Sequence, residues 1–239
     1  MRLDAMLAQI IKVKPKCMTE KCLLLIALLV SFDGESASIN LTNIADNGIK
    51  HWQSKDITTA TRYHVTQYQG RPAIHAVSHN SASGLMLKKR IDLHATPYLN
   101  WSWLAKQTLP HLDEQEKQGD DFIARVYVVI DGGMMFWNTK SISYVWSSSQ
   151  AKGQVWDSPF AGSNVKMMSL RSAKSDTQHW YAEKRNVYQD LVQYFGDKGS
   201  NKANLQSYRY IDMVAIMTDT DNSGGIAESY YGDIILSSR

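Results

Sequence analysis

Short segments in which apolar and polar residues alternate follow one another along most of the chain. In one of them, Leu99, Trp101 and Trp103 alternate with Asn100 and Ser102. A repeat of two residues places alternate side chains on opposite faces of a strand, so this pattern predicts β-strands. Further predicted strands are 62–69, 73–77, 85–93, 141–147, 165–170, 210–217 and 229–236.

A second kind of strand is predicted from Phe122 to Ile130. This segment is almost continuously apolar and rich in β-branched residues, which is typical of a strand covered on both faces. The following Asp131-Gly132-Gly133 predicts a tight turn that leads into a further strand, Met134–Asn138.

One segment predicts a helix. Between Ala182 and Phe195, apolar residues recur at helical spacing, and Gly196 follows as a helix-ending residue. The polar stretches 105–120 and 196–207 are predicted loops. Many short strands, one short helix and no strand–helix alternation indicate an all-β protein, which we expect to be a jelly-roll-like β-sandwich.

The first 37 residues differ from the rest of the chain. Lysines precede an apolar run from Cys22 to Val30, and small residues follow at positions 34, 36 and 37. This order predicts a secretory signal peptide over residues 1–37. The run is nine residues long, whereas a membrane-spanning helix needs about 20. A buried N-terminal helix is the alternative, and Met18 is an alternative start that leaves the export prediction unchanged.

We therefore expect residues 38–239 to form a single β-sandwich domain in the periplasm or outside the cell, without a stable membrane span once the leader is removed. Both cysteines, Cys17 and Cys22, lie in the leader. The mature chain would then lack disulfides, cysteine nucleophiles and thiolate metal sites. The formal net charge is only +3, which argues against a nucleic-acid partner.

Several strings give the chain a recognisable character: GDDFIARVYV at 119–128, YVW at 144–146, RNVYQD at 185–190 with FG at 195–196, and MTDTDN at 217–222 with YYGDI at 230–234. Together they resemble an uncharacterised family of exported bacterial proteins, a domain of unknown function. The resemblance covers roughly residues 49–236 and implies a bacterial source, but no activity or catalytic residues. More loosely, the end of the chain is similar to jelly-roll carbohydrate-binding modules, a likeness of fold and not of function.

A candidate metal site follows from Asp219, Asp221 and Ser223, which alternate and precede Gly224. Oxygen side chains at alternate loop positions can converge on calcium, and glycine permits the sharp bend. An EF-hand is excluded because its twelfth position is Tyr230 instead of a glutamate. The alternative is a turn held by local side-chain to backbone hydrogen bonds.

Arg125 places a charge inside the predicted strand 122–130, on the same face as Tyr127. A charge on a covered face must be paired or hydrated. One hypothesis is that Arg125 and Tyr127 bind a polar ligand on a concave sheet face. The alternative is a structural ion pair, for which the candidate partners are Asp120, Asp121, Glu183 and Asp190.

Trp146 and Trp156 complete the candidate ligand site together with Arg185. Both tryptophans lie near the serine- and glycine-containing stretch 147–153, so we expect them to be exposed and able to stack on sugar rings. Trp101 and Trp103 alternate with polar residues and are expected to point inward. For every tryptophan, packing in the core is the alternative.

No nucleophile elbow, phosphate-binding glycine loop or zinc-binding helix is present in the sequence. The leading hypothesis is a non-catalytic exported protein that binds carbohydrate or another component of the cell envelope. A periplasmic structural or protein-interaction domain is the first alternative. A jelly-roll glycosidase or lyase, with its acids among Asp120, Asp121, Glu183 and Asp190, is the second.

Overall fold

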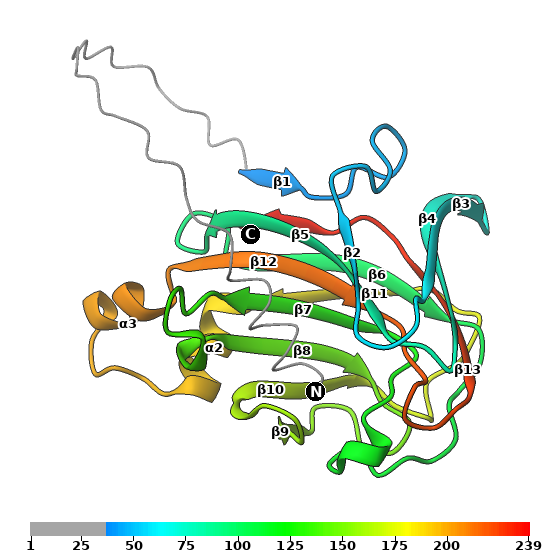
Figure 1. Cartoon of the computed structure of the whole chain (residues 1–239). Coiled ribbons are helices and arrows are strands. Elements are labelled where there is room, and N and C mark those ends of the chain that lie inside the picture. The colour runs from blue at the N-terminus through cyan, green and yellow to red at the C-terminus, as the bar shows by residue number, and fades with distance from the viewer. Residues whose placement is uncertain (1–36) are drawn as a thin grey trace.

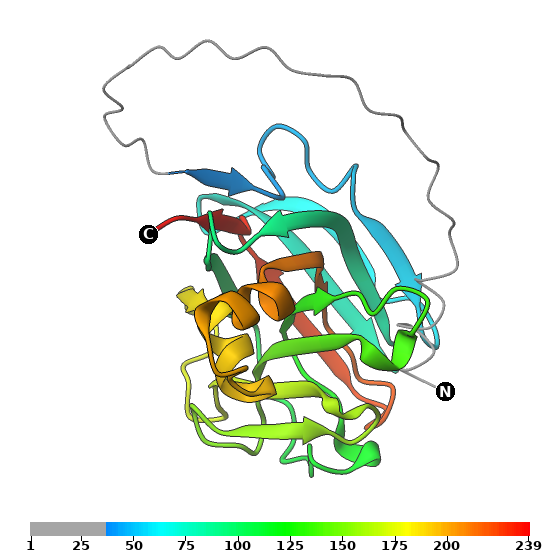
Figure 2. The same cartoon turned by 90° about the vertical axis from the view of Figure 1, so that its left-hand side faces the viewer.

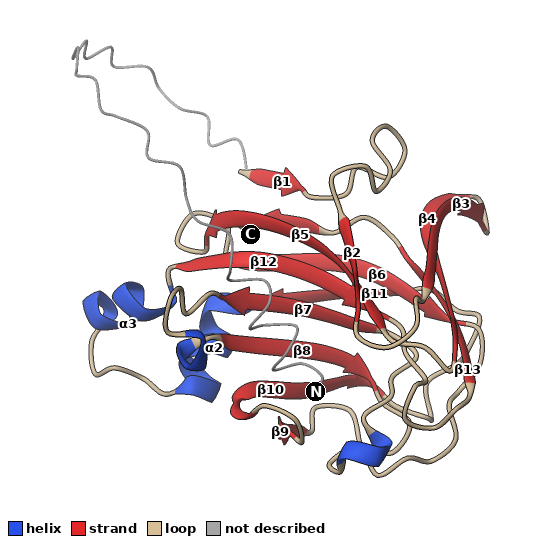
Figure 3. Cartoon of the chain, in the orientation of Figure 1, coloured by secondary structure: helices blue, strands red, loops and turns tan. Residues whose placement is uncertain are grey.

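The short alternating segments form strands that divide between two sheets packed face to face (Figures 1 and 3). The computed structural model describes residues 37–239, so the predicted signal peptide lies, except for its last residue, outside the described residues. Each sheet has seven strands. This arrangement confirms the predicted all-β, jelly-roll-like β-sandwich.

Sheet A contains β1 (Ser38–Asn40), β3 (Arg62–Tyr68), β4 (Arg71–His79), β6 (Tyr98–Ala105), β11 (Tyr181–Asn186), β13 (Ile226–Tyr231) and β14 (Ile235–Ser237). Sheet B contains β2 (Gln53–Asp56), β5 (Ser83–Asp92), β7 (Arg125–Ile130), β8 (Lys140–Trp146), β9 (Val155–Ser158), β10 (Gly162–Arg171) and β12 (Tyr210–Met217). The chain crosses between the sheets repeatedly: β4, β6, β11 and β13 belong to sheet A, whereas β5, β7 and β12 belong to sheet B. Among the described strand pairs, β8 with β10 is parallel and the others are antiparallel.

Aromatic residues from both sheets fill the space between them. Trp101 and Trp103 from β6 point inward, as the alternation predicted, and both are buried. The ring centroid of Trp101 lies 5.4 Å from that of Tyr144, and that of Trp103 lies 6.1 Å from that of Trp146. These contacts pack β6 of sheet A directly onto β8 of sheet B.

Strand β7 is buried on both faces, which confirms the interpretation of its continuous apolar sequence. Val126 and Val128 belong to the cluster between the sheets. Tyr127 and Val129 belong to a second cluster on the opposite face of sheet B, together with Met213. An outward face of a sandwich sheet is commonly polar, so this second apolar layer is a distinctive feature of the chain.

The helix prediction was wrong at its start. Residues 181–186 pair with β6 as strand β11, and helix α2 runs only over Val187–Phe195. Asn186 sets the boundary because its side chain accepts a hydrogen bond from the backbone N–H of Gln189, as an N-cap does. Gly196 ends the helix at a φ of 93°, a region that favours glycine.

A second helix, α3 (Asn201–Tyr208), occupies a stretch predicted to be a loop. Ser200 caps it by accepting a hydrogen bond from the N–H of Ala203. The single predicted helix is therefore corrected to two in residues 37–239, and Figure 2 views the end of the sandwich where both lie. No helix in these residues is long and apolar enough to cross a membrane.

The predicted strand at Met134–Asn138 is also corrected. These residues lie in the loop between β7 and β8 and include a single 3-10 turn, Phe136–Asn138. Another 3-10 turn, Lys117–Gly119, interrupts the otherwise irregular stretch before β7.

Candidate functional site

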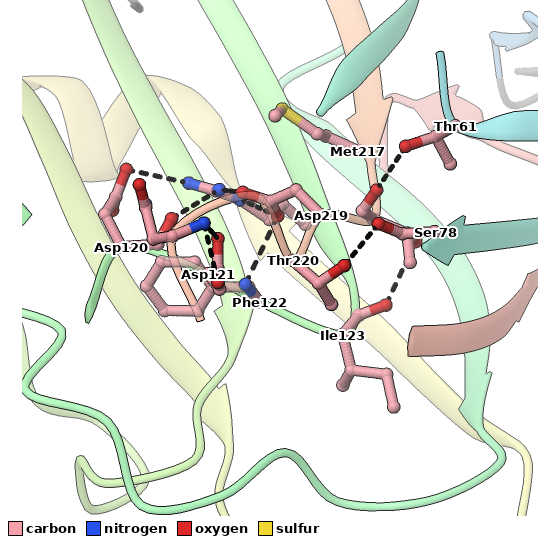
Figure 4. Close-up of polar contacts among 12 residues, drawn as sticks. Thr61, Ser78, Asp120, Asp121, Phe122, Ile123, Met217, Asp219 and Thr220 are labelled. Atoms are coloured by element: carbon pink, nitrogen blue, oxygen red, sulfur yellow. Dashed lines mark hydrogen bonds and ion pairs between the residues drawn. The ribbon is translucent and has the colours of Figure 1, made fainter. Parts of the chain in front are cut away.

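Two acidic segments meet at one end of sheet B. Asp120 and Asp121 come shortly before β7, and Asp219 and Asp221 follow β12. Because β7 and β12 are antiparallel neighbours with Met217 opposite Arg125, the start of one strand lies beside the end of the other. Figure 4 shows the carboxylates of Asp120, Asp121 and Asp219 gathered in one region.

Arg125 forms the centre of this cluster and is only 3% exposed. Its Nε donates to Asp219 Oδ1 at 3.0 Å, and its Nη2 donates to Asp219 Oδ2. Nη1 reaches Asp120 Oδ2 at 3.4 Å, and Nη2 also donates to the backbone oxygen of Asp120 at 2.9 Å. The ion-pair alternative for Arg125 is therefore correct. Asp120 was among its expected partners, and Asp219 was not.

Asp121 connects the two acidic segments. It is fully buried, and its carboxylate accepts the backbone N–H groups of Asn222 at 3.1 Å and Ser223 at 2.5 Å. Asp121, Asp219 and Asp221 each present a carboxylate oxygen within 4.8 Å of the others. The sequence had predicted Ser223, and not Asp121, as the third member of this metal-binding group. Ser223 is exposed and contacts Asp121 through its backbone N–H.

A small pocket opens between these side chains. Its volume is about 20 Å³, and it is lined by Ile57, Ala82, Asp120, Arg125, Tyr127, Phe160, Met217, Asp219, Asp221 and Asn222. Asp120 is 8% exposed, and its buried Oδ1 has no hydrogen-bond partner among the described residues. Burial raises the pKa of Asp120 to about 6, against the opposing effect of Arg125.

Buried hydroxyl groups hold the loop after β12 in place (Figure 4). Ser78 Oγ lies 2.7 Å from Thr220 Oγ1, and Thr61 Oγ1 donates to the backbone oxygen of Thr218 at 2.9 Å. Thr218 Oγ1 in turn donates to the backbone oxygen of Ile123 at 3.0 Å. These bonds tie the acidic loop to β4 and to the segment before β7, so the carboxylates are positioned by a rigid frame.

The aromatic members of the predicted ligand site are buried, so their expected exposure was wrong. Trp146 is 2% and Trp156 is 7% exposed. The indole N–H of Trp156 donates to the backbone oxygen of Glu114 at 3.2 Å, which satisfies it inside the protein. Trp146 packs against Trp103. Tyr127 is also buried, although it does line the acidic pocket.

Arg185 lies apart from the acidic pocket. Its Nε donates to Asp190 Oδ2 at 3.0 Å, and the same oxygen accepts the hydroxyl of Tyr144 at 2.8 Å. Arg185 therefore anchors α2 to the core. Glu183 likewise pairs with Arg171 and not with Arg125.

A groove that was not predicted from the sequence lies on the outer face of sheet A. It has a volume of about 400 Å³ and is lined by Asn100, Trp101, Ser102, Ala182, Glu183, Lys184, Asp233 and Ile235. The Nζ atom of Lys184 lies 4.7 Å from the ring centroid of Tyr98. Asp233 Oδ1 accepts hydrogen bonds from Thr42 Oγ1 at 2.7 Å and from the N–H of Ile44 at 2.9 Å. The polar residues that alternate with Trp101 and Trp103 were the signal for this face.

Stacked aromatic side chains lie on the same outer face. The Tyr68 and Tyr230 ring centroids are 3.9 Å apart, and those of His75 and Tyr230 are 4.4 Å apart. Leu104, two residues after Ser102 on β6, packs in one cluster with Tyr230 and is joined by Tyr68 and Trp180. The outer face of sheet A thus carries polar groups around the groove and an aromatic stack whose central ring, Tyr230, is buried.

Residues 50–235 match the family model described as "Protein of unknown function (DUF3047)", so the chain belongs to this family. The predicted resemblance to an uncharacterised family is confirmed. The comparison with curated proteins finds no match.

Solved structures with a similar backbone fold include a carbohydrate-binding module and a cellulase. The family 11 carbohydrate-binding module of Lic26A-Cel5E from Clostridium thermocellum is 8% identical, with 85% of this chain and 95% of that chain covered and a TM-score of 0.44. A cellulase derived from Cel12A of Rhodothermus marinus is 10% identical, with coverages of 84% and 100% and a TM-score of 0.40. Similarity this low carries no argument about ligand or activity.

Proposed function

We propose that this DUF3047 member is a non-catalytic exported module that binds carbohydrate in the groove on the outer face of sheet A. The observation that carries the proposal is the groove itself, with its volume of about 400 Å³ and a mostly apolar surface that includes a few polar side chains. Binding sites for small ligands commonly have volumes of about 300–1,000 Å³ and a few fixed polar groups.

The chemistry of the lining supports a polyhydroxylated ligand. The Lys184 ammonium group donates hydrogen bonds, the Asp233 carboxylate accepts them, and both line the groove. Asp233 is held in place by Thr42 and Ile44, which limits the entropy lost on binding. Tyr68, on the same sheet face, is partly exposed and adds the kind of apolar surface that suits the C–H face of a sugar, whereas Tyr230 beneath it is buried.

The acidic pocket argues against glycoside hydrolysis. A glycosidase places its substrate between two carboxyl groups. The pocket beside Asp120, Asp219 and Asp221 has a volume of only about 20 Å³, which is enough for about one water molecule. Among the acids considered for catalysis, Glu183 and Asp190 are engaged by Arg171 and Arg185.

A glycan array probed with residues 38–239 tests the proposal. We expect selective binding that falls at least about tenfold in Ala182→Trp, because Ala182 is an exposed residue of the groove wall and indole bulk would fill the groove. Lys202→Trp, at an exposed position of α3, is the matched control and should bind like the parent. Absence of glycan binding, or equal binding by Ala182→Trp, would contradict the proposal.

A second candidate function, protein interaction, is favoured by the loop between β7 and β8. Met134 is 96% and Trp137 is 58% exposed, and Met135 beside them is also exposed. Adjacent large apolar side chains on a surface loop are typical of contact sites. A photo-crosslinking residue at position 134 should capture a discrete partner protein, whereas one at position 202 should not. The same products at both positions would argue against this function.

A further inference from the structure

The acidic pocket at the end of sheet B has the properties of a cation site. We propose that Asp121, Asp219 and Asp221 bind one hard divalent cation of the calcium type. Their carboxylate oxygens lie within 4.8 Å of one another. This separation allows a single ion to contact all three, since calcium–oxygen distances are about 2.3–2.6 Å.

The charge balance of the cluster supports a bound cation. Four carboxylates gather here, those of Asp120, Asp121, Asp219 and Asp221. Among the described residues that line the pocket, Arg125 is the one cationic side chain. Three of the four acids are buried. Buried charges are costly unless they are paired or coordinate a metal. The hydrogen bonds of Arg125 go to Asp219 and Asp120, whereas the buried carboxylate of Asp121 accepts neutral backbone N–H groups.

Asp120 supplies a second, independent observation. More than nine-tenths of this residue is buried, and its Oδ1 has no hydrogen-bond partner among the described residues. Asp120 lines the same pocket as Asp219 and Asp221. Buried polar atoms are nearly always satisfied by protein, water or an ion. The pocket volume of about 20 Å³ has room for about one such particle.

The contacts already made by two of the proposed ligands, Asp121 and Asp219, leave capacity for an ion. Asp121 accepts two backbone N–H groups, and an ionised carboxylate has about four acceptor positions. Asp219 accepts Arg125 and the N–H of Phe122. A set made of carboxylate oxygens, without sulfur or imidazole, favours calcium, magnesium or manganese over zinc. The irregular origin of the ligands, from two loops, suits the flexible coordination of calcium.

Terbium, a luminescent substitute for calcium, tests the site directly. Tyr127 lines the pocket, so excitation of the protein should sensitise terbium bound there. We expect luminescence from chelator-treated protein that calcium displaces, and at least a tenfold loss of terbium affinity in Asp221→Asn. Asp221 is only partly buried, so this variant should fold. Asp176→Asn, at an exposed position, is the matched control and should retain full luminescence.

Thermal unfolding provides a second readout. A ligand that binds only the native state stabilises it by mass action, so 1 mM calcium should raise the melting temperature by about 5 °C or more, and Asp221→Asn should lose this increase. Absence of terbium luminescence, or unchanged luminescence in Asp221→Asn, would overturn the proposal. Glycan binding in the groove of sheet A uses other residues, so its presence or absence does not decide this test.

Discussion

Arg125 and Asp219 form a buried, two-pronged ion pair between residues 94 positions apart in the sequence. The pair joins the first residue of β7 to the loop that follows β12. Both side chains are almost inaccessible to solvent, so neither charge can be rehydrated if its partner is removed. The pair therefore fixes the relative position of the two acidic segments.

Replacement of Arg125 by methionine should strongly destabilise the protein. The variant leaves Asp219 and Asp120 buried without their guanidinium, and breaking a buried pair in this way costs about 3–5 kcal/mol. Urea unfolding of Arg125→Met and the parent measures the difference. The control is Arg90→Met, because the Arg90 side chain is 65% exposed and pairs with Asp212 at the surface, where an ion pair is worth about 1 kcal/mol or less. Equal losses in the two variants would show that Arg125 has no special structural role.

The tryptophans should report two environments. Trp101, Trp103 and Trp146 are buried in the core, whereas Trp137 is exposed. Fluorescence emission should be blue-shifted overall, with a small component that acrylamide quenches readily. Trp137→Phe should remove the readily quenched component. Trp146→Phe should lower the blue-shifted intensity and leave the readily quenched component unchanged. Ready quenching that persists in both Trp137→Phe and the double variant Trp137→Phe/Trp180→Phe would mean that a core tryptophan is accessible, since Trp180 is the one other tryptophan that is only partly buried.

Much of the fold was predictable because a two-residue repeat reports directly which face of a strand is buried. The inward direction of Trp101 and Trp103 followed from Asn100 and Ser102 between them, and the double burial of β7 followed from its continuous apolar sequence. The start of α2 was not predictable in this way. Residues 182–186 fit a helix locally, but pairing with β6 holds them in a strand until Asn186 caps the helix.

The candidate site was only partly predictable. The alternating acids after β12 indicated Asp219 and Asp221, but Asp121 lies about 100 residues earlier and joins them only through the antiparallel pairing of β7 with β12. Trp156 was misplaced for a related reason. Its neighbours in sequence are polar, yet a distant backbone oxygen, that of Glu114, satisfies its indole N–H in the interior.

The N-cap of α2 should contribute measurably to stability. Asn186→Ala removes the acceptor for the backbone N–H of Gln189, and such substitutions cost about 1 kcal/mol. Chemical unfolding measures this loss, and hydrogen exchange should show faster opening at the first turn of α2. Asn186→Asp is the control, since aspartate also accepts this hydrogen bond and should retain most of the stability. If Asn186→Ala left the free energy of unfolding unchanged, the pairing of β11 with β6 alone would fix the start of the helix.

Protonation of His75 should weaken the protein as the pH falls. Burial lowers the pKa of His75 below its usual value of 6.5, and the charged form gains only a partial offset from Glu228. The unfolded chain then binds the proton more tightly than the folded chain. The stabilising contribution of neutral His75 is therefore complete above about pH 6.5 and decreases as the pH falls through that value.

The parent protein should therefore lose more stability between pH 7.5 and pH 5.0 than His75→Gln does. His79→Gln, at an exposed position of the same strand, should follow the parent. Melting temperatures at both pH values provide the measurement, and an equal decrease in the parent and His75→Gln would assign the pH dependence to other groups.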